Sequence, residues 1–499
     1  MSTATTLVWF RQDLRTQDNP ALFYAAEQGW VVPIYILDDR HPGEFDLGSA
    51  SRGWLHQSLT ALNQQLQGAL RFFRGDPLLL IPRLLRDSGI RRVAWNRCYQ
   101  PGQIHQDSSL KRLLIDQGID VQSYNGSLLW EPWTVLKKDQ TPYKVFTAYY
   151  RNGCLRREPP RFPLPRPVNL SLPADLPETC SGLPLDALEL LPKQGWYEGV
   201  AVYWQPGELG AADRLAEFVN QALAEYSRGR DYPAIQATSR LSPHLHFGEL
   251  SPNQVWYVAS QYPLTTCSEA GRELFMRQLG WREFSYYLLY HWPTLPQQNF
   301  QPKFDRFVWR NNPQALLAWQ QGRTGIPLVD AGMRELWQTG TMHNRVRMLV
   351  GSFLVKNLGI DWRLGAAWFW DTLVDADLAN NSASWQWIAG SGADAAPYFR
   401  IFNPVTQGQK FDPQGLYVKR YCPELAELPA KHIHAPWLAP TALLAECRVV
   451  LDRSYPRPIV DLKQSRQAAL DAFAALREHS QPTEGSASAN RGKYIGRDR

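Results

Sequence analysis

Five short apolar runs in the first third of the chain limit its fold more than any other feature. Between them lie amphipathic stretches in which apolar residues recur three or four positions apart, as in the leucines at 55, 59, 62 and 66. Strands that alternate with helices form a parallel sheet with helices on both faces. No GxGxxG follows the first run, so we expect a Rossmann-like domain without the usual dinucleotide fingerprint. The runs are 6–10, 31–38, 70–75, 91–96 and 120–126.

A proline-rich stretch separates this domain from a helical one. Residues 158–192 contain nine prolines, which excludes regular helix or sheet there. From about residue 211 the apolar residues follow helical spacing. We predict an α/β class chain with a doubly wound parallel sheet domain at 1–132, a connector at 133–204, a larger all-α domain at 205–480 and a disordered tail at 481–499. Within the all-α domain the spacing predicts helices over 274–289, 331–356, 362–378 and 462–476.

Composition adds one strong signal and excludes several classes of protein. The chain has 20 Trp, 21 Tyr and 20 Phe among 499 residues, an excess beyond what core filling requires. A net charge of +6 is too small to indicate a polyanionic partner by itself. Six cysteines lie far apart without a CxxC pair, so neither a metal site nor a disulfide framework is predicted. No apolar run approaches about 18 residues, and we therefore expect a soluble, cytoplasmic protein.

Consecutive hydroxyl groups mark one candidate binding segment, at residues 238–242. Its hydroxyls and backbone N–H groups stand where a helix should begin, an arrangement that suits a phosphate group. Capping of the helix explains the same residues, and from this segment alone capping is the commoner outcome.

Polar side chains inside apolar helices mark a second candidate segment, at residues 322–404. Asn344 and Met348 are four positions apart, as are Asp377 and Asn381, so the members of each pair share a helix face. Buried polar groups need partners. A structural network could provide them, but a large polar-edged aromatic ligand such as a flavin explains them better.

Long motifs in a fixed order carry a resemblance to a known family. They occupy 9–15, 232–252, 279–284, 324–348, 375–387 and 396–425. With these motifs the chain resembles the photolyase/cryptochrome family from about residue 6 to residue 476. Segments 368–378, 436–440 and 455–470 resemble the branch nearest plant cryptochromes, which includes the class III cyclobutane pyrimidine dimer photolyases.

The resemblance implies that the helical domain binds FAD in a folded conformation, which favours phosphate binding over capping at 238–242. Arg347 and Asp375 are expected to form a buried ion pair over the flavin ring. The positions that match the family's phosphate contacts are Tyr226, Thr238, Ser239, Arg240, Leu241 and Ser242. Those that match its isoalloxazine and adenosine contacts are Arg282, Asn344, Arg347, Asp375, Asp377 and Asn381.

The resemblance also implies a light-driven lyase in which excited, reduced FAD donates an electron to split cyclobutane pyrimidine dimers flipped out of DNA. Asn381 matches the residue that faces flavin N5, where plant blue-light receptors carry Asp. An amide can form a hydrogen bond there but cannot deliver a proton, which favours repair over signalling. A (6-4) photolyase would carry two His where this chain has Asn344 and Met348. A cryptochrome-type photoreceptor and a (6-4) photolyase are the alternatives.

By the same resemblance, further positions match the family's substrate, electron-transfer and DNA contacts. Gln278 stands where dimer photolyases carry Glu, which leaves the lesion class open. The two pocket indoles are expected to stack on the flipped dimer; two core tryptophans are the alternative. The substrate pocket matches Gln278, Trp281, Asn344, Met348 and Trp387. The electron-transfer chain matches Trp385, Trp362 and Trp309. The DNA phosphate contacts match Arg230, Arg345 and Arg400, with Lys410, Lys419 and Arg420 as weaker candidates.

A second chromophore is the last expectation. Asn96, Tyr99 and Gln100 follow the run 91–96, where they could form an antenna cleft or, equally well, cap a loop. We favour a folate, 5,10-methenyltetrahydrofolate, over a deazaflavin or a flavin, and no antenna is the remaining alternative. The expected partner is damaged DNA, in duplex or single strand, bound by a monomer without membrane association.

Overall fold

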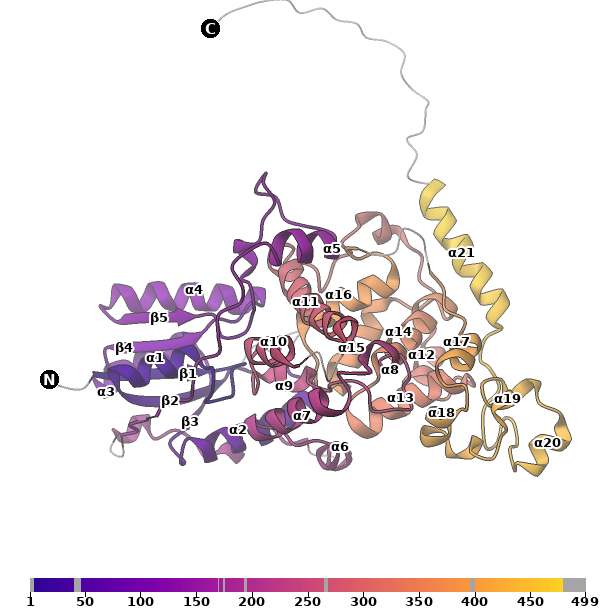
Figure 1. Cartoon of the computed structure of the whole chain (residues 1–499), viewed down its shortest axis with the longest axis horizontal. Helices are drawn as coiled ribbons and strands as arrows, with labels where there is room; N and C mark the ends of the chain where they lie inside the picture. Colours follow the sequence, from indigo (N-terminus) through magenta and orange to yellow (C-terminus); the bar gives the residue numbers. More distant parts are fainter. Residues whose placement is uncertain are drawn as a thin grey trace, which may run out of the picture.

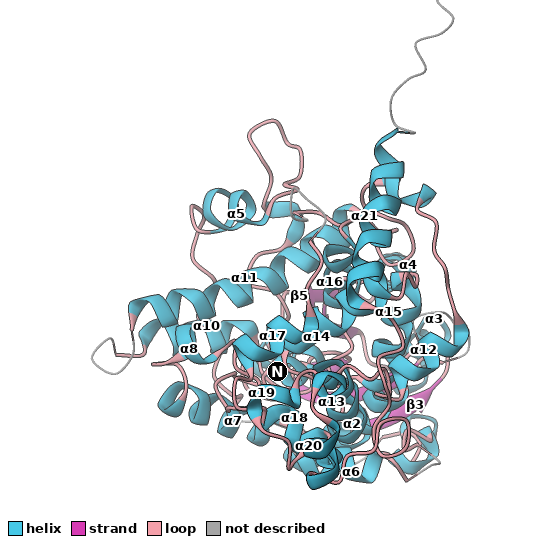
Figure 2. Cartoon of the chain, turned by 90° about the vertical axis from the view of Figure 1, so that its right-hand side faces the viewer, coloured by secondary structure: helices cyan, strands magenta, loops and turns pink. Residues whose placement is uncertain are grey.

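The computed structural model describes residues 4–39, 46–168, 170–173, 176–192, 195–263, 268–394 and 400–478. A sheet domain lies at one end of the molecule and a helical domain occupies the rest (Figure 1). Viewed from the helical end, helices lie in front and the strands lie behind them (Figure 2). The predicted tail at 481–499 lies outside the described residues.

The first domain contains a five-stranded parallel sheet in the order β3-β2-β1-β4-β5. Alternate residues of the central strand face opposite sides. Val8 and Phe10 pack in one core with α1 and α2, whereas Leu7 and Trp9 pack in another with α3 and α4. The predicted doubly wound sheet is confirmed. Its elements are β1 (Ala4–Phe10), α1 (Pro20–Gln28), β2 (Gly29–Leu37), α2 (Ser49–Gln65), β3 (Arg71–Arg74), α3 (Pro77–Ser88), β4 (Arg92–Asn96), α4 (Pro101–Asp116) and β5 (Asp120–Tyr124).

The connector is irregular, as its prolines predict. Between 158 and 192 the described residues form only two 3-10 turns, Glu178–Cys180 and Leu185–Leu188, and isolated bridges tie Ser171 to Trp30 and Leu183 to Phe72. The stretch therefore runs along the sheet domain. Before it lie a 3-10 turn (Pro132–Thr134), α5 (Phe146–Ala148) and a π-helical turn (Tyr149–Cys154).

The second domain is all-helical, and no β-strand occurs in the described part of the chain after Tyr124. None of the helices that the structure describes is long and apolar enough to cross a membrane. The helices are α6 (Tyr197–Tyr203), α7 (Glu208–Gln221), α8 (Tyr226–Gly229), α9 (Ser242–Phe247), α10 (Pro252–Gln261), α11 (Glu269–His291), α12 (Pro313–Gln320), α13 (Pro327–Thr339), α14 (Asn344–Ser352), α15 (Trp362–Thr372), α16 (Leu378–Ala389), α17 (Pro404–Phe411), α18 (Leu416–Tyr421), α19 (Ala430–Ile433), α20 (Thr441–Glu446) and α21 (Leu462–Glu478).

Two of the predicted helices were wrong in extent. The stretch 331–356 is divided because Gly340, with a φ of 66°, ends α13 in the left-handed conformation. The stretch 362–378 ends at Thr372, because Leu373 is extended and the side chain of Asp377 caps the next helix, α16. An aspartate is more stable at an N-cap than inside a helix, which explains the second break.

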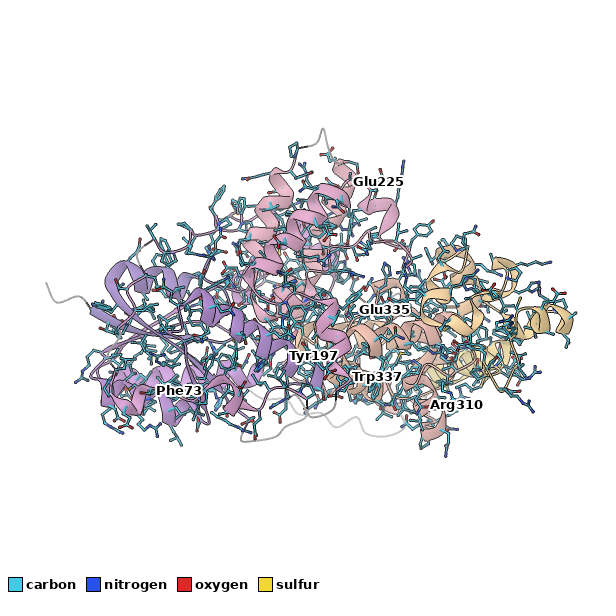
Figure 3. The ribbon with its side chains drawn as sticks, turned by 90° about the horizontal axis from the view of Figure 1, so that it is seen from below. Phe73, Tyr197, Glu225, Arg310, Glu335 and Trp337 are labelled. Carbon is cyan, nitrogen blue, oxygen red and sulfur yellow. The ribbon has the colours of Figure 1, made fainter. Side chains whose placement is uncertain are left out.

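Close contacts join the two domains. Tyr197 of α6, labelled in Figure 3, packs against Gly53 of α2. A Cβ atom at Gly53 would lie only 2.5 Å from Cζ of Tyr197. Glu283 of α11 accepts hydrogen bonds from the backbone N–H groups of Leu129 (2.8 Å) and Trp130 (3.2 Å). Burial raises the pKa of Glu283 to about 7, although Arg282 and these backbone donors act to lower it.

We predict that Glu283→Gln makes this contact insensitive to pH. The folded-state pKa of Glu283 is raised, so its contribution to stability is present below the ordinary pKa and is lost as pH rises through about 7. The stability of the variant relative to the native protein should therefore increase from pH 5 to pH 8, by roughly 3 kcal/mol at most. Unfolding in denaturant at both pH values measures the difference.

The control is Glu273→Gln, at an exposed position of the same helix. Its stability relative to the native protein should be the same at pH 5 and pH 8. Equal pH dependence in the two variants would contradict the assignment to Glu283.

Candidate flavin and DNA site

A central cavity of about 530 Å³ lies in the helical domain. Ten of the twelve residues predicted to bind FAD line it, as do all five predicted for the substrate pocket. The structure thus brings together positions that are far apart in the sequence. The ten are Tyr226, Ser239, Leu241, Ser242, Arg282, Asn344, Arg347, Asp375, Asp377 and Asn381.

Thr238 and Arg240 are the two that do not line the cavity. The guanidinium of Arg240 donates a hydrogen bond to the hydroxyl of Tyr203 and lies 4.8 Å from the centroid of that ring. Arg240 also has a φ of 53°, a left-handed conformation that turns the chain between Ser239 and Leu241. Its side chain is therefore engaged elsewhere, and only its neighbours reach the cavity.

An ion pair between a half-buried arginine and a buried aspartate lies in the cavity wall. Nη2 of Arg347 lies 3.0 Å from Oδ2 of Asp375, and the same carboxylate oxygen accepts a hydrogen bond from Oγ of Ser242 at 2.5 Å. Nε of Arg347 donates to the carbonyl of Met342 at 2.7 Å. The predicted ion pair is present, but it is only partly buried, because the Arg347 side chain is 24% exposed.

The serine side chains at the start of α9 do not cap the helix. Its N-cap is Leu241, which makes no side-chain cap hydrogen bond. Ser242, the first residue of the helix, donates its hydroxyl to Asp375, and Ser239 lines the cavity. The hydroxyls of Ser239 and Ser242 therefore belong to the cavity wall, which disagrees with the capping alternative.

Asp377 anchors a second polar network. Its Oδ1 accepts from the backbone N–H of Asn380 at 2.8 Å, and its Oδ2 accepts from the hydroxyl of Tyr286. Burial acts to raise the pKa of Asp377, but His246, Tyr286 and the Asn380 N–H together lower it to about 2. Asp377 is thus a fixed negative charge in the cavity wall.

The amide of Asn381 has a defined orientation. Its Nδ2 donates a hydrogen bond to the carbonyl of Ala366 in α15 at 3.1 Å. This bond fixes the plane of the amide relative to the cavity that the side chain lines.

Two half-buried indoles stand in the cavity wall, those of Trp281 and Trp387. Trp281 stacks on Phe146 with ring centroids 3.8 Å apart, so one of its faces is occupied. Gln278 accepts a hydrogen bond from Arg230 at 3.5 Å and donates one to the carbonyl of Leu274 at 3.1 Å. Both polar ends of Gln278 are therefore held.

On α14, Asn344 and Met348 lie on one face as the spacing predicts. Nδ2 of Asn344 approaches Sδ of Met348 to 3.8 Å. Asn344 is exposed and Met348 is half-buried, which places this pair where the cavity opens to solvent.

The three tryptophans predicted to transfer electrons share one hydrophobic core, and of the three only Trp385 lines the cavity. Trp385 is 2% exposed, Trp362 is 1% exposed, and Trp309 is half-buried and packs against that core. Nε1 of Trp362 donates to Asn299 at 3.1 Å. The sequence did not single out Trp319, whose ring lies edge-on to Trp385 with centroids 6.3 Å apart.

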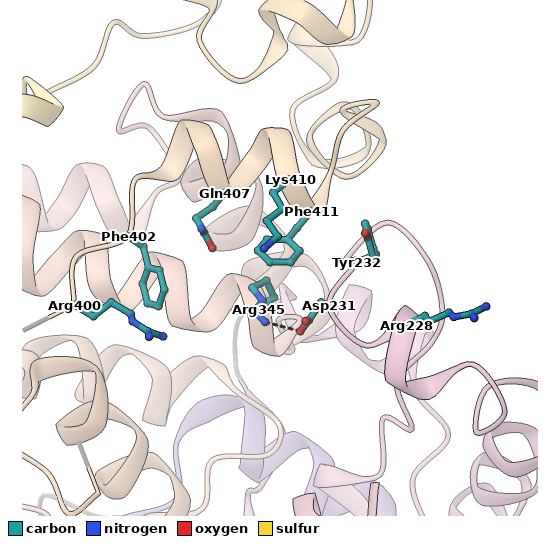
Figure 4. Close-up of a pocket in the computed structure, with 9 residues that line it drawn as sticks. All are labelled: Arg228, Asp231, Tyr232, Arg345, Arg400, Phe402, Gln407, Lys410 and Phe411. Atoms are coloured by element: carbon teal, nitrogen blue, oxygen red, sulfur yellow. Dashed lines mark hydrogen bonds and ion pairs between the residues drawn. The ribbon is translucent and has the colours of Figure 1, made fainter. Parts of the chain in front are cut away.

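A second, basic pocket of about 580 Å³ adjoins α14 and α17 (Figure 4). It is lined by Arg228, Asp231, Tyr232, Arg345, Arg400, Phe402, Gln407, Lys410 and Phe411. Arg345 donates to Asp231 at 2.6 Å and lies 4.5 Å from the centroid of Phe411, while Nζ of Lys410 lies 5.1 Å from the same ring. One carboxylate against four cations leaves this pocket strongly positive.

The six predicted DNA-contacting cations are thus divided. Arg345, Arg400 and Lys410 line the basic pocket, whereas Arg230 lines the central cavity. Lys419 and Arg420 line neither, and Nη2 of Arg420 donates to the carbonyl of Ala234 at 3.3 Å.

The residues predicted for an antenna cleft have internal partners instead. The amide of Asn96 donates to Asp13 at 2.6 Å and to Asn19 at 2.7 Å, and the hydroxyl of Tyr99 donates to Glu131 at 2.8 Å. Gln100 is the N-cap position of α4. These contacts favour internal pairing over an antenna cleft for Asn96 and Tyr99, whereas the side chain of Gln100 makes no cap hydrogen bond.

His246 is a cavity residue that the sequence analysis missed. It lies four positions after Ser242, so helical spacing alone could have placed it on the same face of α9. Both ring nitrogens are buried without a hydrogen-bond partner in the part of the chain that the structure describes. Among those residues no group of three or more His, Cys, Asp or Glu could hold a metal ion.

The lining suits a flavin nucleotide. Arg282 and Arg347 supply positive charge, the serines supply hydroxyl groups, and Asn380 and Asn381 supply amides to pair with a polar-edged ring. Phe275, Leu279, Leu288 and other apolar side chains fill the remaining wall, as is typical of cofactor sites.

Two family models match the chain, "DNA photolyase" over residues 6–167 and "FAD binding domain of DNA photolyase" over residues 275–475. A deoxyribodipyrimidine photo-lyase from Agrobacterium fabrum is 46% identical over 483 residues, which cover 96% of this chain and 99% of the relative. The chain belongs to the photolyase/cryptochrome family.

Both cryptochromes and photolyases are similar to this chain. Cryptochrome-2 from Arabidopsis thaliana is 38% identical over 95% of this chain and 79% of its own length. The crystal structure of a bacterial class III photolyase from Agrobacterium tumefaciens superposes with a TM-score of 0.91 at 45% identity, over 96% of this chain and 98% of that one. The family and the branch predicted from the motifs are confirmed.

We predict that Asn381→Asp destabilises the protein in a pH-dependent way. A carboxylate oxygen would face the Ala366 carbonyl in place of the amide donor, and only protonation restores the hydrogen bond. The pKa of the new carboxyl group would be raised, so stability would be close to native at pH 5 and lower by about 1 to 3 kcal/mol at pH 8. Denaturant unfolding at the two pH values measures the loss.

Asn381→Leu is the matched control, since it removes the same donor but cannot titrate. Its loss of stability should be equal at the two pH values. A loss in Asn381→Asp that does not change with pH would show that the amide does not have the observed partner.

Proposed function

We propose that this protein is a deoxyribodipyrimidine photo-lyase that repairs cyclobutane pyrimidine dimers in DNA. The observation that carries the proposal is that one cavity combines the polar flavin-type lining with two half-buried indoles, Trp281 and Trp387. Similarity to a deoxyribodipyrimidine photo-lyase over nearly the full length supports it. FAD, when bound in its reduced form and excited by blue or near-UV light, supplies the electron that splits the dimer.

Residues of the central cavity bind and orient the flavin and the flipped pyrimidine bases. Arg347 with Asp375, and Asp377, present fixed charges to the flavin nucleotide. Trp281, held from behind by Phe146, offers a stacking surface for flipped bases, worth roughly 1 to 3 kcal/mol per base. Gln278, fixed by Arg230 and Leu274, offers amide hydrogen bonds to the pyrimidine edges.

Cations of the basic pocket position the DNA backbone without reading its sequence. Phosphate contacts fix orientation and are indifferent to bases, which suits lesions in any sequence context. Photolyases, like other enzymes that act on a base, extrude the damaged nucleotide from the duplex into a cavity. Arg345 and Arg400 are therefore proposed to grip the phosphates beside the lesion.

A cryptochrome-type photoreceptor is the second candidate, because Cryptochrome-2 is 38% identical to this chain over 95% of its length. The amide of Asn381 disagrees with it, since that side chain cannot deliver a proton to a bound flavin. A (6-4) photolyase is the third candidate, and Asn344 and Met348 disagree with it because neither is an imidazole acid.

The direct test is repair by the purified protein. Protein with chemically reduced FAD is mixed with an oligonucleotide that contains one thymine dimer and is lit with blue light, and chromatography measures intact thymines. We expect restoration in light and none in the dark. Binding of FAD without restoration would favour the photoreceptor, and restoration of a (6-4) lesion alone would favour the third candidate.

We predict that Trp385→Phe slows light-driven reduction of oxidised FAD but leaves repair with chemically reduced FAD intact. The phenyl ring is much harder to oxidise than indole, and a barrier increase of only about 1.4 kcal/mol slows a step tenfold. Flavin absorbance during illumination measures the rate of FAD reduction. Repair of the thymine dimer by the chemically reduced protein measures the second part of the prediction.

Trp319→Phe is the control, because this indole is fully buried beside Trp385 but is outside the proposed chain. It should reduce FAD at the native rate. Loss of both reduction and repair in Trp385→Phe would instead indicate a structural role for that residue.

We predict that Arg400→Gln lowers DNA affinity equally for all sequences and flattens its salt dependence. One lost phosphate contact should reduce the slope of log affinity against log salt by about 0.9. Arg86→Gln, at a side chain 73% exposed in the sheet domain, is the control and should keep the native slope. Equal slopes for all three proteins would remove Arg400 from the DNA-binding surface.

A folate antenna, a monomeric state and a cytoplasmic location complete the proposal. No contact of Asn96, Tyr99 or Gln100 supports the antenna, so its support is the resemblance alone. The absorption spectrum of chromophores released from the purified protein identifies the antenna, and gel filtration with light scattering gives the oligomeric state.

A further inference from the structure

Asp231 is the one carboxylate among the described residues that line the basic pocket, and it lies beside four cations (Figure 4). A negative charge at this place repels the phosphates that the pocket is proposed to bind, and like charges brought together lower affinity. Asp231 therefore weakens the binding of any phosphate group in this pocket. The four cations are Arg228, Arg345, Arg400 and Lys410.

The contacts of Asp231 join the basic pocket to the central cavity. Its Oδ1 accepts a hydrogen bond from Nη2 of Arg345 at 2.6 Å and lies 4.0 Å from Nε of Arg230. Arg230 lines the central cavity and donates to the side chain of Gln278 at 3.5 Å. One carboxylate oxygen thus contacts an arginine of each pocket, and through Arg230 it is linked to the amide that is proposed to meet the pyrimidine edges.

Both arginines are accessible to a ligand and are also held in place. The side chains of Arg345 and Arg230 are 23% and 19% exposed, and that of Asp231 is 35% exposed. Arg345 lies 4.5 Å from the ring centroid of Phe411, and Arg230 lies 5.4 Å from that of Tyr226. A guanidinium group fixed by a carboxylate and an aromatic ring keeps one orientation, so it favours ligands whose phosphates match that orientation.

Undamaged and damaged DNA use the two pockets differently under the proposed function. An undamaged duplex offers phosphates alone, whereas a flipped dimer also enters the central cavity. Repulsion by Asp231 acts on both kinds of DNA, but the orientation of Arg230 and Gln278 favours only the flipped dimer. A repulsive group that penalises one ligand more than another is a source of specificity.

We propose that Asp231 is a specificity-determining residue, which lowers the affinity of the basic pocket for undamaged DNA and positions Arg345 and Arg230 for DNA with a flipped dimer. This inference rests on the proposed function, because the ligand is DNA. It gives a role to a carboxylate that the sequence did not single out, directly after Arg230 in the chain.

The test removes the charge of Asp231 and keeps the shape of the side chain. Full-length native protein and Asp231→Asn, both loaded with FAD, are titrated in the dark into a fluorescent duplex with or without one thymine dimer, and anisotropy at one salt concentration gives the dissociation constants. We expect Asp231→Asn to bind the undamaged duplex at least about threefold more tightly, as for the loss of one exposed charge interaction. The dimer-containing duplex should gain less, so that the preference for the dimer falls.

Two control variants separate this role from an effect of net charge or of folding. Asp231→Glu keeps the charge and should keep the native affinity for the undamaged duplex. Asp213→Asn removes the same charge at an exposed position of α7 that lines neither pocket, and it should leave both affinities native.

Three results would overturn the proposal. They are an affinity for the undamaged duplex that does not rise in Asp231→Asn, an equal gain for both duplexes, and the same gain in Asp213→Asn. A purely structural role of Asp231 would produce the first of these, because a disturbed pocket binds both duplexes more weakly. A native protein without preference for the dimer would instead overturn the proposed function, so the two failures are distinguishable.

Discussion

The ion pair between Arg347 and Asp375 is the interaction on which the central cavity depends. Asp375 is buried, so loss of Arg347 would leave its carboxylate without a counter-charge, which is strongly unfavourable. Arg347 comes from α14, Asp375 from the segment between α15 and α16, and Ser242 from the first turn of α9. Three distant segments are thereby held around one cavity.

Different kinds of side chain gather around that pair and in the neighbouring pocket. The buried carboxylate of Asp377 and the half-buried indoles of Trp281 and Trp387 line the central cavity, and four cations line the basic pocket. The central cavity therefore suits a polar aromatic ligand, and the basic pocket suits a polyanion. This arrangement is what a reaction between a flavin and an extruded nucleotide needs, and it makes the modest net charge effective at one place.

The tryptophan excess has two physical explanations. Trp9, Trp54 and Trp95 are almost fully buried in the sheet domain and fill its cores. The proposal gives other roles to Trp281, Trp309, Trp362, Trp385 and Trp387, where a large ring that stacks and is readily oxidised is useful. Trp319 is fully buried and edge-on to Trp385 but has no proposed role, so burial beside one of these indoles does not by itself separate the two groups.

The sequence by itself determined the elements whose contacts are local. In the sheet domain, apolar runs that alternate with amphipathic stretches predicted the parallel sheet. Helical spacing beyond residue 211 predicted the all-α domain, and four-residue spacing placed Asn344 beside Met348. Long motifs identified the family, because they retain the order of residues that one ancestral site required. The helix breaks at Gly340 and Asp377 were missed, since helical spacing continues across both.

Only the tertiary structure decided which side chains line the cavity. Arg240 turns to Tyr203, Asn96 donates to Asp13, Tyr99 donates to Glu131, and His246 of α9 lies 3.5 Å from Asp377. These outcomes depend on partners far away in the chain. Periodicity reports which face a residue occupies, whereas hydrogen-bond pairing depends on where the rest of the protein places the complementary group.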